Sequence, residues 1–383
     1  MSAMNRSYTS VDALIQRARR RIPKFVFEYL AHGCHSNVCV RKNTEQLREV
    51  ELRPFYMREF AGATLKTRLF DREYDAPFGI SPIGLQGLIW PRATEILAAA
   101  AKKHNVPFVL STVATASLED VGDITDGDFW FQLYHPADDG FRDALLDRAE
   151  AAGCHTLVLL ADTPTPAFRP HDIRNGLALP PKMSLRNIGQ MLLRPRWCAG
   201  QLSAGKPEFK TLNPYLPVKP NMKDFPAFWR RTFDGRLTES RVQAIRDRWG
   251  GRIVIKGIVE PEEMEKAIRI GVDGVIISNH GGRQIDLGQS AIRSLQSMVT
   301  EFQSQIVIMM DSGIRTGGDI AAAMASGAQF CFLGRTPMFS LAALGEAGGE
   351  HVLELLKYSL QQVMEQIGCE TISDLPEHLV RPI

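Results

Sequence analysis

Eight short apolar runs recur along the sequence, and they constrain the fold more than any other feature. They span residues 78–83, 108–111, 129–134, 157–161, 253–258, 275–277, 306–310 and 330–333. Helix-length segments lie between them, for example at residues 93–104, 142–152, 261–270 and 318–326. Apolar runs without polar alternation are typical of strands covered on both faces, and their alternation with helices predicts a parallel sheet. Eight such units predict a closed α/β barrel of the (β/α)8 type.

Glycines mark the ends of three of these helices. Gly153, Gly271 and Gly327 each stand just before the next apolar run. A glycine at this place allows the left-handed backbone conformation in which a chain leaves a helix and turns back. The repeated order of helix, glycine and strand supports the barrel.

The remaining segments are assigned around this barrel as parts of a single domain, residues 1–383. Residues 1–75 are expected to form a helical cap, with a helix over residues 11–30 that Pro23 interrupts. The barrel is expected over residues 76–345, with a long insertion at 182–223 after the fourth strand, and a helical segment over residues 346–383. Barrels of this kind often exceed 250 residues as one domain.

Composition indicates a soluble protein with reduced thiols. The hydrophobic fraction is 44% and the charged fraction 23%, which are ordinary values. The six cysteines contain no Cys-x-x-Cys pair, so neither disulfides nor a metal site are expected. No apolar run of 18 residues and no secretory signal is found, so a cytoplasmic location is expected. The net charge of +2 gives no reason to expect a nucleic-acid partner.

Polar or glycine-bearing groups follow every predicted strand. In (β/α)8 barrels the carboxyl ends of the strands carry the chemistry. Converging polar groups at one rim cost desolvation energy unless a ligand compensates it. These positions are therefore candidate site residues: Pro82, Ile83, Gly84, Ser111, Gln132, Tyr134, Asp162, Lys256, Ser278, His280, Asp311, Gly334 and Arg335.

Residues 275–286 carry the strongest local signal. His280 has an unperturbed pKa near neutrality and is a candidate general base, and Arg283 has the donor fork that matches a carboxylate. Gly281 and Gly282 allow a sharp turn and close approach to a ligand. Together they suggest proton abstraction from a small carboxylic acid. A structural histidine in a solvated loop is the alternative.

The ends of the last two strands suggest a phosphate site. Residues 311–315 (Asp-Ser-Gly-Ile-Arg) and residues 334–335 (Gly-Arg) offer backbone N–H groups and guanidinium forks, and barrels often bind phosphate between these loops. Lys256 could place positive charge beside a redox ring. No Gly-x-Gly-x-x-Gly fingerprint follows the first strand, which argues against a nicotinamide cofactor in a Rossmann unit. Ordinary glycine turns are the alternative.

The motifs at residues 278–284, 131–134, 162–164, 256–257 and 311–315 resemble, in order and spacing, those of the FMN-dependent L-2-hydroxy acid oxidases and dehydrogenases. The resemblance extends from about residue 23 to 369. It implies FMN as cofactor and oxidation of an L-2-hydroxy acid to the 2-keto acid. The pattern is most similar to bacterial quinone-linked lactate and mandelate dehydrogenases. The alternatives are reduction of O2, an FMN isomerase, or a non-catalytic barrel that binds phosphate.

The resemblance also implies roles for individual residues. His280 would be the catalytic base, Asp162 would orient it, and Tyr134 would contact the substrate hydroxyl. Tyr29, Arg169 and Arg283 would hold the substrate carboxylate. The expected FMN contacts are Pro82, Ile83, Gly84, Ser111, Gln132, Lys256, Ser278, Asp311, Gly313, Arg315, Gly334 and Arg335. Leu160 replaces a threonine common in the family, and Val113 and Gly84 are small residues that would enlarge the substrate pocket.

The insertion is strongly basic. Residues 182–223 contain eight Lys or Arg residues and one acidic residue, Glu208. Its apolar side chains at 191–193 and at Trp197 are expected to be exposed, and this composition suits contact with an anionic membrane surface. A peripheral position on the inner face of the cytoplasmic membrane would place the enzyme near a quinone. The alternatives are a lid over the site or a subunit contact of a homo-oligomer.

Overall fold

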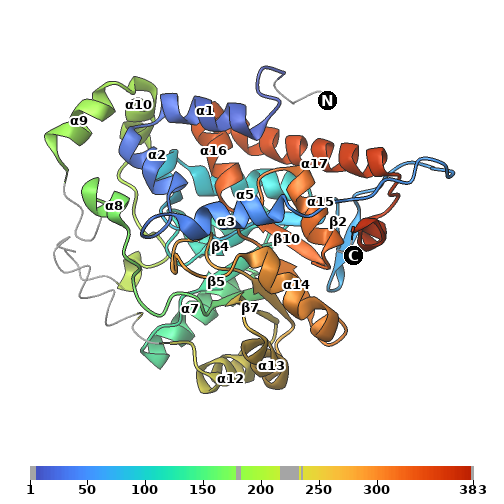
Figure 1. Ribbon diagram of the computed structural model, residues 1–383. Coiled ribbons are helices and arrows are strands. Elements are labelled where there is room, and N and C mark those ends of the chain that lie inside the picture. The colour runs from blue at the N-terminus through green and yellow to red at the C-terminus, as the bar shows by residue number, and fades with distance from the viewer. Residues whose placement is uncertain (1–5, 178–182, 216–232, 234–235, 381–383) are drawn as a thin grey trace.

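Eight parallel strands form the centre of the molecule, in the order β3-β10-β9-β8-β7-β6-β5-β4. A computed structural model describes residues 6–177, 183–215, 233 and 236–380. An isolated parallel bridge between Ile80 and Phe108 joins the two outer strands and closes the ring (Figure 1). The predicted barrel is confirmed. Its strands are β3 (Phe78–Ile80), β4 (Val109–Ser111), β5 (Trp130–Leu133), β6 (Thr156–Leu160), β7 (Arg252–Ile258), β8 (Gly274–Ile277), β9 (Val307–Met310) and β10 (Phe330–Leu333).

An antiparallel hairpin, β1 (Thr67–Leu69) and β2 (Arg72–Tyr74), lies at the amino-terminal end of the barrel. Its Leu69 and Tyr74 belong to the apolar cluster that fills the barrel interior, together with Trp130 and Phe330 at the starts of their strands. The prediction of a helical cap over residues 1–75 was thus wrong for residues 67–74, which form this hairpin. Because apolar packing closes this end, a polar site has room only at the opposite rim.

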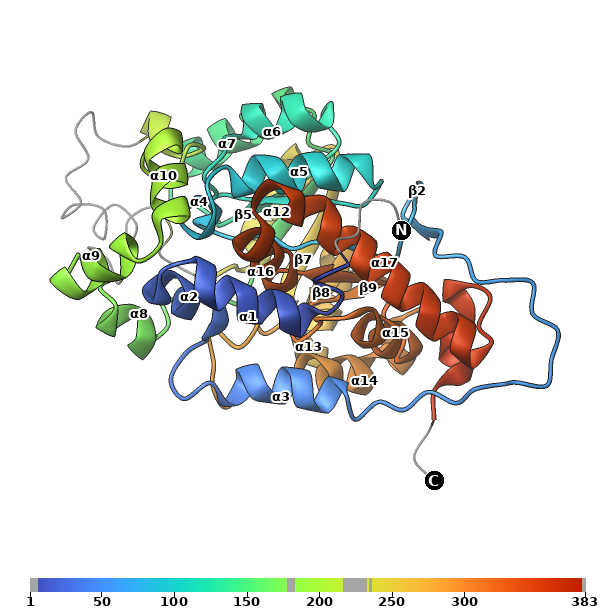
Figure 2. The same cartoon turned by 90° about the horizontal axis from the view of Figure 1, so that it is seen from above.

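Helices cover the outside of the barrel (Figure 2). Buried apolar side chains fill the layer between helices and strands, as expected where both faces of a sheet are covered. The surrounding helices are α5 (Ala93–Lys103), α6 (Leu118–Thr125), α7 (Asp139–Ala151), α12 (Glu239–Arg248), α13 (Pro261–Ile270), α14 (Ala291–Phe302), α15 (Gly317–Ala325) and α16 (Arg335–Leu344). Gly153, Gly271 and Gly327 all have positive φ, which agrees with their predicted role.

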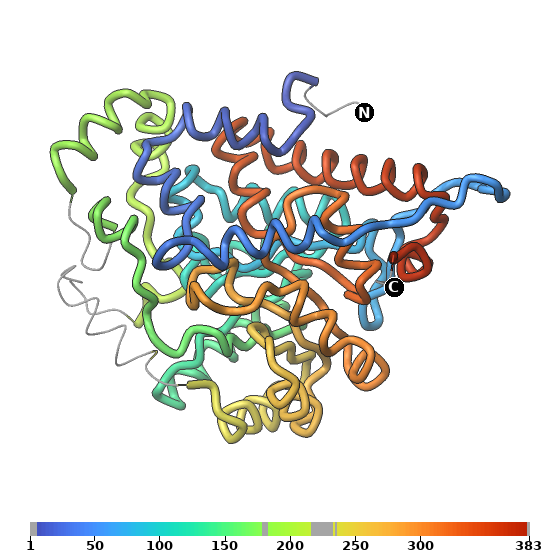
Figure 3. The backbone as a smooth tube through the Cα atoms, in the orientation of Figure 1, coloured from blue at the N-terminus to red at the C-terminus, as the bar shows by residue number. Residues whose placement is uncertain are grey.

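The amino-terminal segment folds over the carboxyl-end rim. Pro23 separates α1 (Val11–Arg21) from α2 (Lys24–Ala31), and α3 (Val38–Leu47) follows. Helix α1 lies along α16, and α17 (Gly348–Ile367) packs on α15 and α16 (Figure 3). The remaining short helices are α4 (Gln86–Ile89), η2 (Gly345–Ala347) and η3 (Ile372–His378).

The connection between β6 and β7, which includes the predicted insertion at residues 182–223, contains helices in its described part. They are α8 (Pro170–Arg174), which precedes the insertion, and α9 (Leu185–Leu192), α10 (Pro195–Ala204) and η1 (Asn213–Tyr215) within it. Trp197, expected to be exposed, is 4% exposed, and its indole N–H donates to the carbonyls of Leu88 and Ile89 at 3.2 Å. That expectation was wrong because this ring anchors α10 to the barrel. Lys182, Lys219 and Lys223 lie outside the described residues.

Candidate active site

Five polar side chains at the carboxyl ends of the strands are buried. They are Ser111, Gln132, Lys256, Ser278 and Asp311, and none is more than 6% exposed. Parallel strands end at the same edge, so β4, β5, β7, β8 and the residue after β9 deliver these groups to one rim. Buried polar groups are costly unless they are paired. The rim is therefore a candidate ligand-binding site, because it gathers buried polar groups in an otherwise apolar barrel.

The turn after β8 has an unusual backbone. His280, Gly281 and Gly282 have φ values of 56°, 63° and 73°. A non-glycine residue with positive φ is strained, so its surroundings must hold it. The Ser278 hydroxyl accepts from the His280 N–H at 3.0 Å, and the Ser312 hydroxyl accepts from the Gly281 N–H at 2.9 Å. Neighbouring hydroxyls thus fix the direction of the His280 side chain.

His280 pairs with Asp162, which follows β6. The distance from His280 Nδ1 to Asp162 Oδ1 is 2.9 Å, and Lys256 Nζ lies 3.6 Å from the other carboxylate oxygen. Burial lowers the pKa of His280 despite the opposing effect of Asp162, and Lys256 lowers it further. Burial acts to raise the pKa of Asp162, but Lys256 and His280 lower it overall. The pair is thus a neutral imidazole beside an ionised carboxylate.

Lys256 lies between two carboxylates. Its Nζ is 3.6 Å from Asp162 and 3.4 Å from Asp311, and it donates to the Ser278 hydroxyl at 2.9 Å. Burial acts to lower the pKa of Lys256, but the two aspartates raise it overall. The rim thus contains a buried ammonium ion that stays charged.

Two arginines converge beside His280. Arg169 Nε donates to the Arg283 carbonyl at 3.4 Å, and Asp172 lies 4.0 Å from Arg169 and 3.9 Å from Arg283. The Arg283 guanidinium lies 5.0 Å from the centre of the Tyr29 ring. Burial, and then the charge of Arg169, lower the pKa of Arg283 to about 10. Arg283 thus stays cationic at neutral pH, and with the guanidinium of Arg169 beside it this corner is suited to a carboxylate.

Tyr134 follows β5 and shares the electrostatic environment of this corner. Burial, and then the negative charge of Asp162, raise the pKa of its hydroxyl. The phenol therefore remains protonated and can donate a hydrogen bond at physiological pH.

A second cationic corner lies at the ends of β9 and β10. Arg335 donates to the carbonyls of Leu30, Gly281 and His32, and neither it nor Arg315 forms an ion pair among the described residues. Burial lowers the pKa of Arg315 to about 10. Burial also lowers the pKa of Arg335, and Arg315 lowers it further. Gly334 is the N-cap of α16, so helix N–H groups face the same corner, which is suited to a phosphate.

The turns that carry these arginines are closely packed. Gly313 has a φ of 94°, and a Cβ there would lie 2.3 Å from the Asn43 carbonyl oxygen of α3. Only glycine permits this approach. The α3 helix therefore supports the corner from behind.

The wall after β3 and β4 is apolar. Pro82, Ile83 and Gly84 are partly exposed, and a Cβ on Gly84 would lie 2.8 Å from the Val113 side chain. Val113 packs with Leu212 from the insertion and with Phe233, which follows the insertion in the chain, and Leu160 is 6% exposed. The space next to Val113 is thus occupied by side chains from the connection between β6 and β7, which the sequence analysis did not foresee.

Sequence reasoning missed two further residues of this rim. Asp172 lies between the two arginines of the carboxylate corner. Gln284 Nε2 donates to the Asp162 carbonyl at 3.1 Å, and its Oε1 accepts from Arg169. The spacing of Asp172, three residues after Arg169, would have indicated a shared helix face.

Comparison with known proteins identifies the family. Residues 18–382 match the family model described as FMN-dependent dehydrogenase. The chain belongs to the FMN-dependent dehydrogenase family. It is 36% identical over 368 residues to an L-lactate dehydrogenase of Allorhizobium ampelinum, covering 96% of this chain and 97% of that protein.

Solved structures agree with this assignment. A crystal structure of the monotopic membrane protein (S)-mandelate dehydrogenase superposes with a TM-score of 0.93 at 31% identity, covering 98% of this chain and 100% of that one. A mandelate oxidase structure superposes with a TM-score of 0.81 at 29% identity, covering 98% and 99%. The family resemblance seen in the sequence is confirmed, and FMN is the cofactor of the family.

The rim fits FMN. Gln132 Nε2 is buried and has no hydrogen-bond partner among the described residues, while its Oε1 accepts from Ser111 at 2.9 Å. A buried amide donor without a partner costs free energy unless a ligand accepts from it. A flavin has carbonyl and ring-nitrogen acceptors, and the FMN phosphate is an anion of the kind that two guanidinium groups such as those of Arg315 and Arg335 bind.

Proposed function

We propose that this enzyme oxidises an L-2-hydroxy acid to the corresponding 2-keto acid. The observation that carries the proposal is the neutral His280, paired with Asp162 at 2.9 Å, next to the arginine corner. A base beside a carboxylate clamp suits a substrate with a carboxylate and an adjacent carbinol. The related proteins named for lactate and mandelate support this substrate class.

The substrate carboxylate would be held by Arg283 and Arg169, with Tyr29 beside them. Guanidinium groups bind carboxylates through two parallel hydrogen bonds. The Asp172 carboxylate lies 4.0 Å from Arg169 and 3.9 Å from Arg283. A single carboxylate at these distances can orient both guanidinium groups but cannot neutralise the charge of both. Tyr134 would donate its hydrogen bond to the substrate hydroxyl or the keto oxygen.

His280 would take a proton at Nε2. Its Nδ1 faces Asp162, so the neutral ring carries its proton at Nδ1 and leaves the Nε2 lone pair free. Asp162 then stabilises the imidazolium that forms. This arrangement follows the general logic of a base held in one tautomer by a carboxylate.

FMN would be held by the residues after β3, by Ser111, Gln132, Lys256 and Ser278, and by Asp311 at the ribityl chain. Its phosphate would bind Gly313, Arg315, Gly334 and Arg335. When bound, FMN supplies the acceptor for the two electrons that leave the substrate. Lys256, charged and buried, would favour negative charge on the nearby ring.

Anaerobic spectroscopy tests this function. The purified protein should be yellow, and addition of lactate or mandelate without O2 should bleach its flavin absorbance. A quinone analogue should then restore the colour faster than O2 does. Faster reoxidation by O2 would identify an oxidase, and a flavin that neither acid bleaches would overturn the substrate class.

We also propose that α9 and α10 bind the surface of an anionic membrane, where a quinone acceptor is dissolved. Helix α9 buries Asn187, which donates to the Asn175 carbonyl at 2.9 Å. Its apolar side chains point to solvent instead: Leu185 is 88%, Ile188 44% and Leu192 76% exposed. Their spacing places them on one helix face. An outward apolar face is typical of a helix that lies in a membrane interface.

Basic side chains also occur on α9, on α10 and in the segment that follows α10. Arg186, Arg196 and Lys206 form no ion pair among the described residues, whereas Lys210 pairs with Asp120 at 3.1 Å. No helix within the described residues is long and apolar enough to cross a bilayer. The relative with a TM-score of 0.93 is itself a monotopic membrane protein, which supports surface contact.

Vesicle sedimentation tests the membrane contact. The protein should sediment with vesicles that contain anionic lipid at low salt. Its binding should weaken at high salt, because charge attraction contributes about 1 kcal/mol per basic residue and is screened. Protein that stays in the supernatant at low salt would contradict the contact and would favour a lid or subunit contact.

A further inference from the structure

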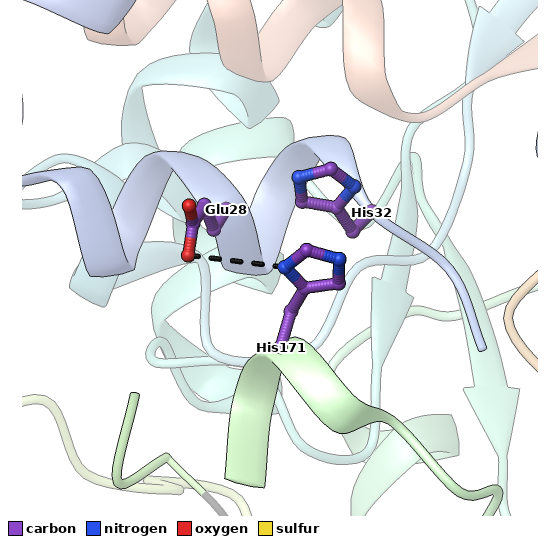
Figure 4. Close-up of side chains that lie close together, drawn as sticks. All are labelled: Glu28, His32 and His171. Carbon is purple, nitrogen blue, oxygen red and sulfur yellow. Dashed lines mark ion pairs between the residues drawn. The ribbon is translucent and has the colours of Figure 1, made fainter. Parts of the chain in front are cut away.

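Three potential metal ligands lie together outside the catalytic rim. Glu28 lies on α2, His32 is the residue that caps the end of this helix, and His171 comes from α8 (Figure 4). One ligand atom from each residue lies within 4.8 Å of the others. The two imidazole rings are stacked at 3.8 Å with an interplanar angle of 4°. The spacing of Glu28 and His32 puts both on one side of the end of α2.

The chemistry of these groups suits a divalent cation. A carboxylate oxygen and two imidazole nitrogens lie within reach of one another. Two imidazoles and a carboxylate with one open position are a common zinc ligand set.

Glu28 already has partners with which a metal would compete. Lys24 lies 3.6 Å from its carboxylate, and the Asn175 amide donates to it at 2.6 Å. Arg174 Nη2 lies 3.3 Å from Glu28 Oε2 and 2.9 Å from His171 Nδ1. Its side chain is 55% exposed, so it can move into solvent. The guanidinium occupies the position between the two ligand atoms and competes with a metal for them.

We propose that Glu28, His32 and His171 form a site for a zinc-class divalent cation that ties α8 to α2. Zinc holds nitrogen and oxygen ligands at about 2.0–2.2 Å, and an imidazole nitrogen binds a metal in the plane of its ring. The stacked rings of His32 and His171 must therefore turn out of the stack to face one cation, and Arg174 must leave. Imidazole ligands favour Zn²⁺ and Co²⁺ over Mg²⁺ and Ca²⁺. The ligands come from segments about 140 residues apart, and no sequence spacing could have revealed them.

The site adjoins the proposed carboxylate clamp. The Tyr29 and His32 carbonyls, at the end of α2, each accept from Arg283 Nη1 at 2.8 Å. Arg169 is the N-cap of α8. A cation that joins the two helices would therefore fix the elements that carry both arginines.

Calorimetric titration of the chelator-treated, tag-free holoprotein with Zn²⁺ tests the site. We expect one Zn²⁺ per chain. His32→Asn, His171→Asn and Glu28→Gln should each weaken binding by at least about 10- to 100-fold, since loss of an outer-shell partner alone has that effect. Arg174→Ala should strengthen binding because it removes the competing cation. Co²⁺ should give the absorption bands of a four-coordinate site, and Mg²⁺ should not bind.

His35→Asn is the matched control. His35 is exposed, lies beside Phe168 and has a φ of 42°, which asparagine tolerates. It should bind Zn²⁺ like the wild type. Absence of Zn²⁺ binding, or equal binding by the His32 and His171 variants, would overturn the proposal. Unchanged affinity in Glu28→Gln would remove the carboxylate from the ligand set.

Hydrogen exchange gives a second measurement that does not depend on activity. Zn²⁺ should slow amide exchange in residues 168–177 of the wild type and leave it unchanged in His171→Asn. Equal exchange with and without bound Zn²⁺ in the wild type would show that the cation does not join the helices. Either result is independent of the substrate class proposed above.

Discussion

The strand-end rim and the α9–α10 surface depart from the usual distribution of side chains in opposite ways. The rim buries charged groups such as Lys256 and Asp311 inside an apolar barrel. The α9–α10 surface exposes Leu185 and Leu192 and buries Asn187. Soluble proteins normally place charges outside and leucines inside. Each departure lowers the stability of the isolated chain. It therefore indicates a binding partner whose contacts compensate for this cost.

The two partners differ in kind. At the rim, directed donors and guanidinium groups require a ligand of fixed shape and charge, which FMN and a small acid provide. The exposed apolar side chains of α9 and the nearby basic residues make no directed contacts. They can therefore bind any extended apolar and anionic surface, such as a membrane. Substitutions should therefore separate the two regions: rim variants should change turnover and not membrane binding, and α9 variants should do the reverse.

The largest effect is expected for His280→Gln. Loss of a proton acceptor typically lowers rates by about 10²- to 10⁴-fold. Flavin reduction followed by stopped-flow absorbance should slow accordingly, with flavin content unchanged. His280→Asn is the companion variant, because asparagine tolerates the positive φ at this position. Both variants should sediment with vesicles as the wild type does. Flavin reduction at the normal rate would exclude His280 as the base.

The sequence predicted the barrel because its signal is local and repeated. Each barrel strand lies in a mostly apolar run, and the end of the run indicates the end of the strand. The rim residues then follow from topology, since all strands of a parallel barrel end at one edge. The hairpin at residues 67–74 was missed because its two strands, Thr67–Leu69 and Arg72–Tyr74, are mostly polar and each buries one side chain.

What the sequence could not show depends on distant packing. Trp197 resembles an interfacial residue in a basic stretch, and only its contact with α4 reveals an anchor. Phe233 and Leu212 reach Val113 across more than 90 positions. Asp172 has a role only once α8 places it between Arg169 and Arg283. Clusters whose side chains come from distant segments of the chain produce no recognisable spacing in the sequence.

A smaller rate effect, with a defined change in pH dependence, is expected for Asp162→Asn. The amide can donate to Nδ1 and favour the tautomer that carries its proton at Nε2, which should slow flavin reduction by about 10²-fold. Asp162 raises the pKa of His280. Without it that pKa falls further, so the acid limb of kcat/KM should move to lower pH. A shift to higher pH would contradict the assigned interaction.

The smallest effects are expected on α9. Leu185→Ser and Leu192→Ser each remove a side chain whose burial contributes about 1.5–3 kcal/mol, so each should weaken vesicle binding by about 10-fold or more. Met57→Ser is the control: Met57 is fully exposed, on the segment between α3 and β1 at the opposite end of the molecule (Figure 2). Anaerobic flavin reduction should stay normal in all three variants, because none lies at the rim. If the leucine variants bind vesicles as the wild type does, the exposed face of α9 does not bind the membrane. The contrast between the two regions would then rest on the rim and its ligands.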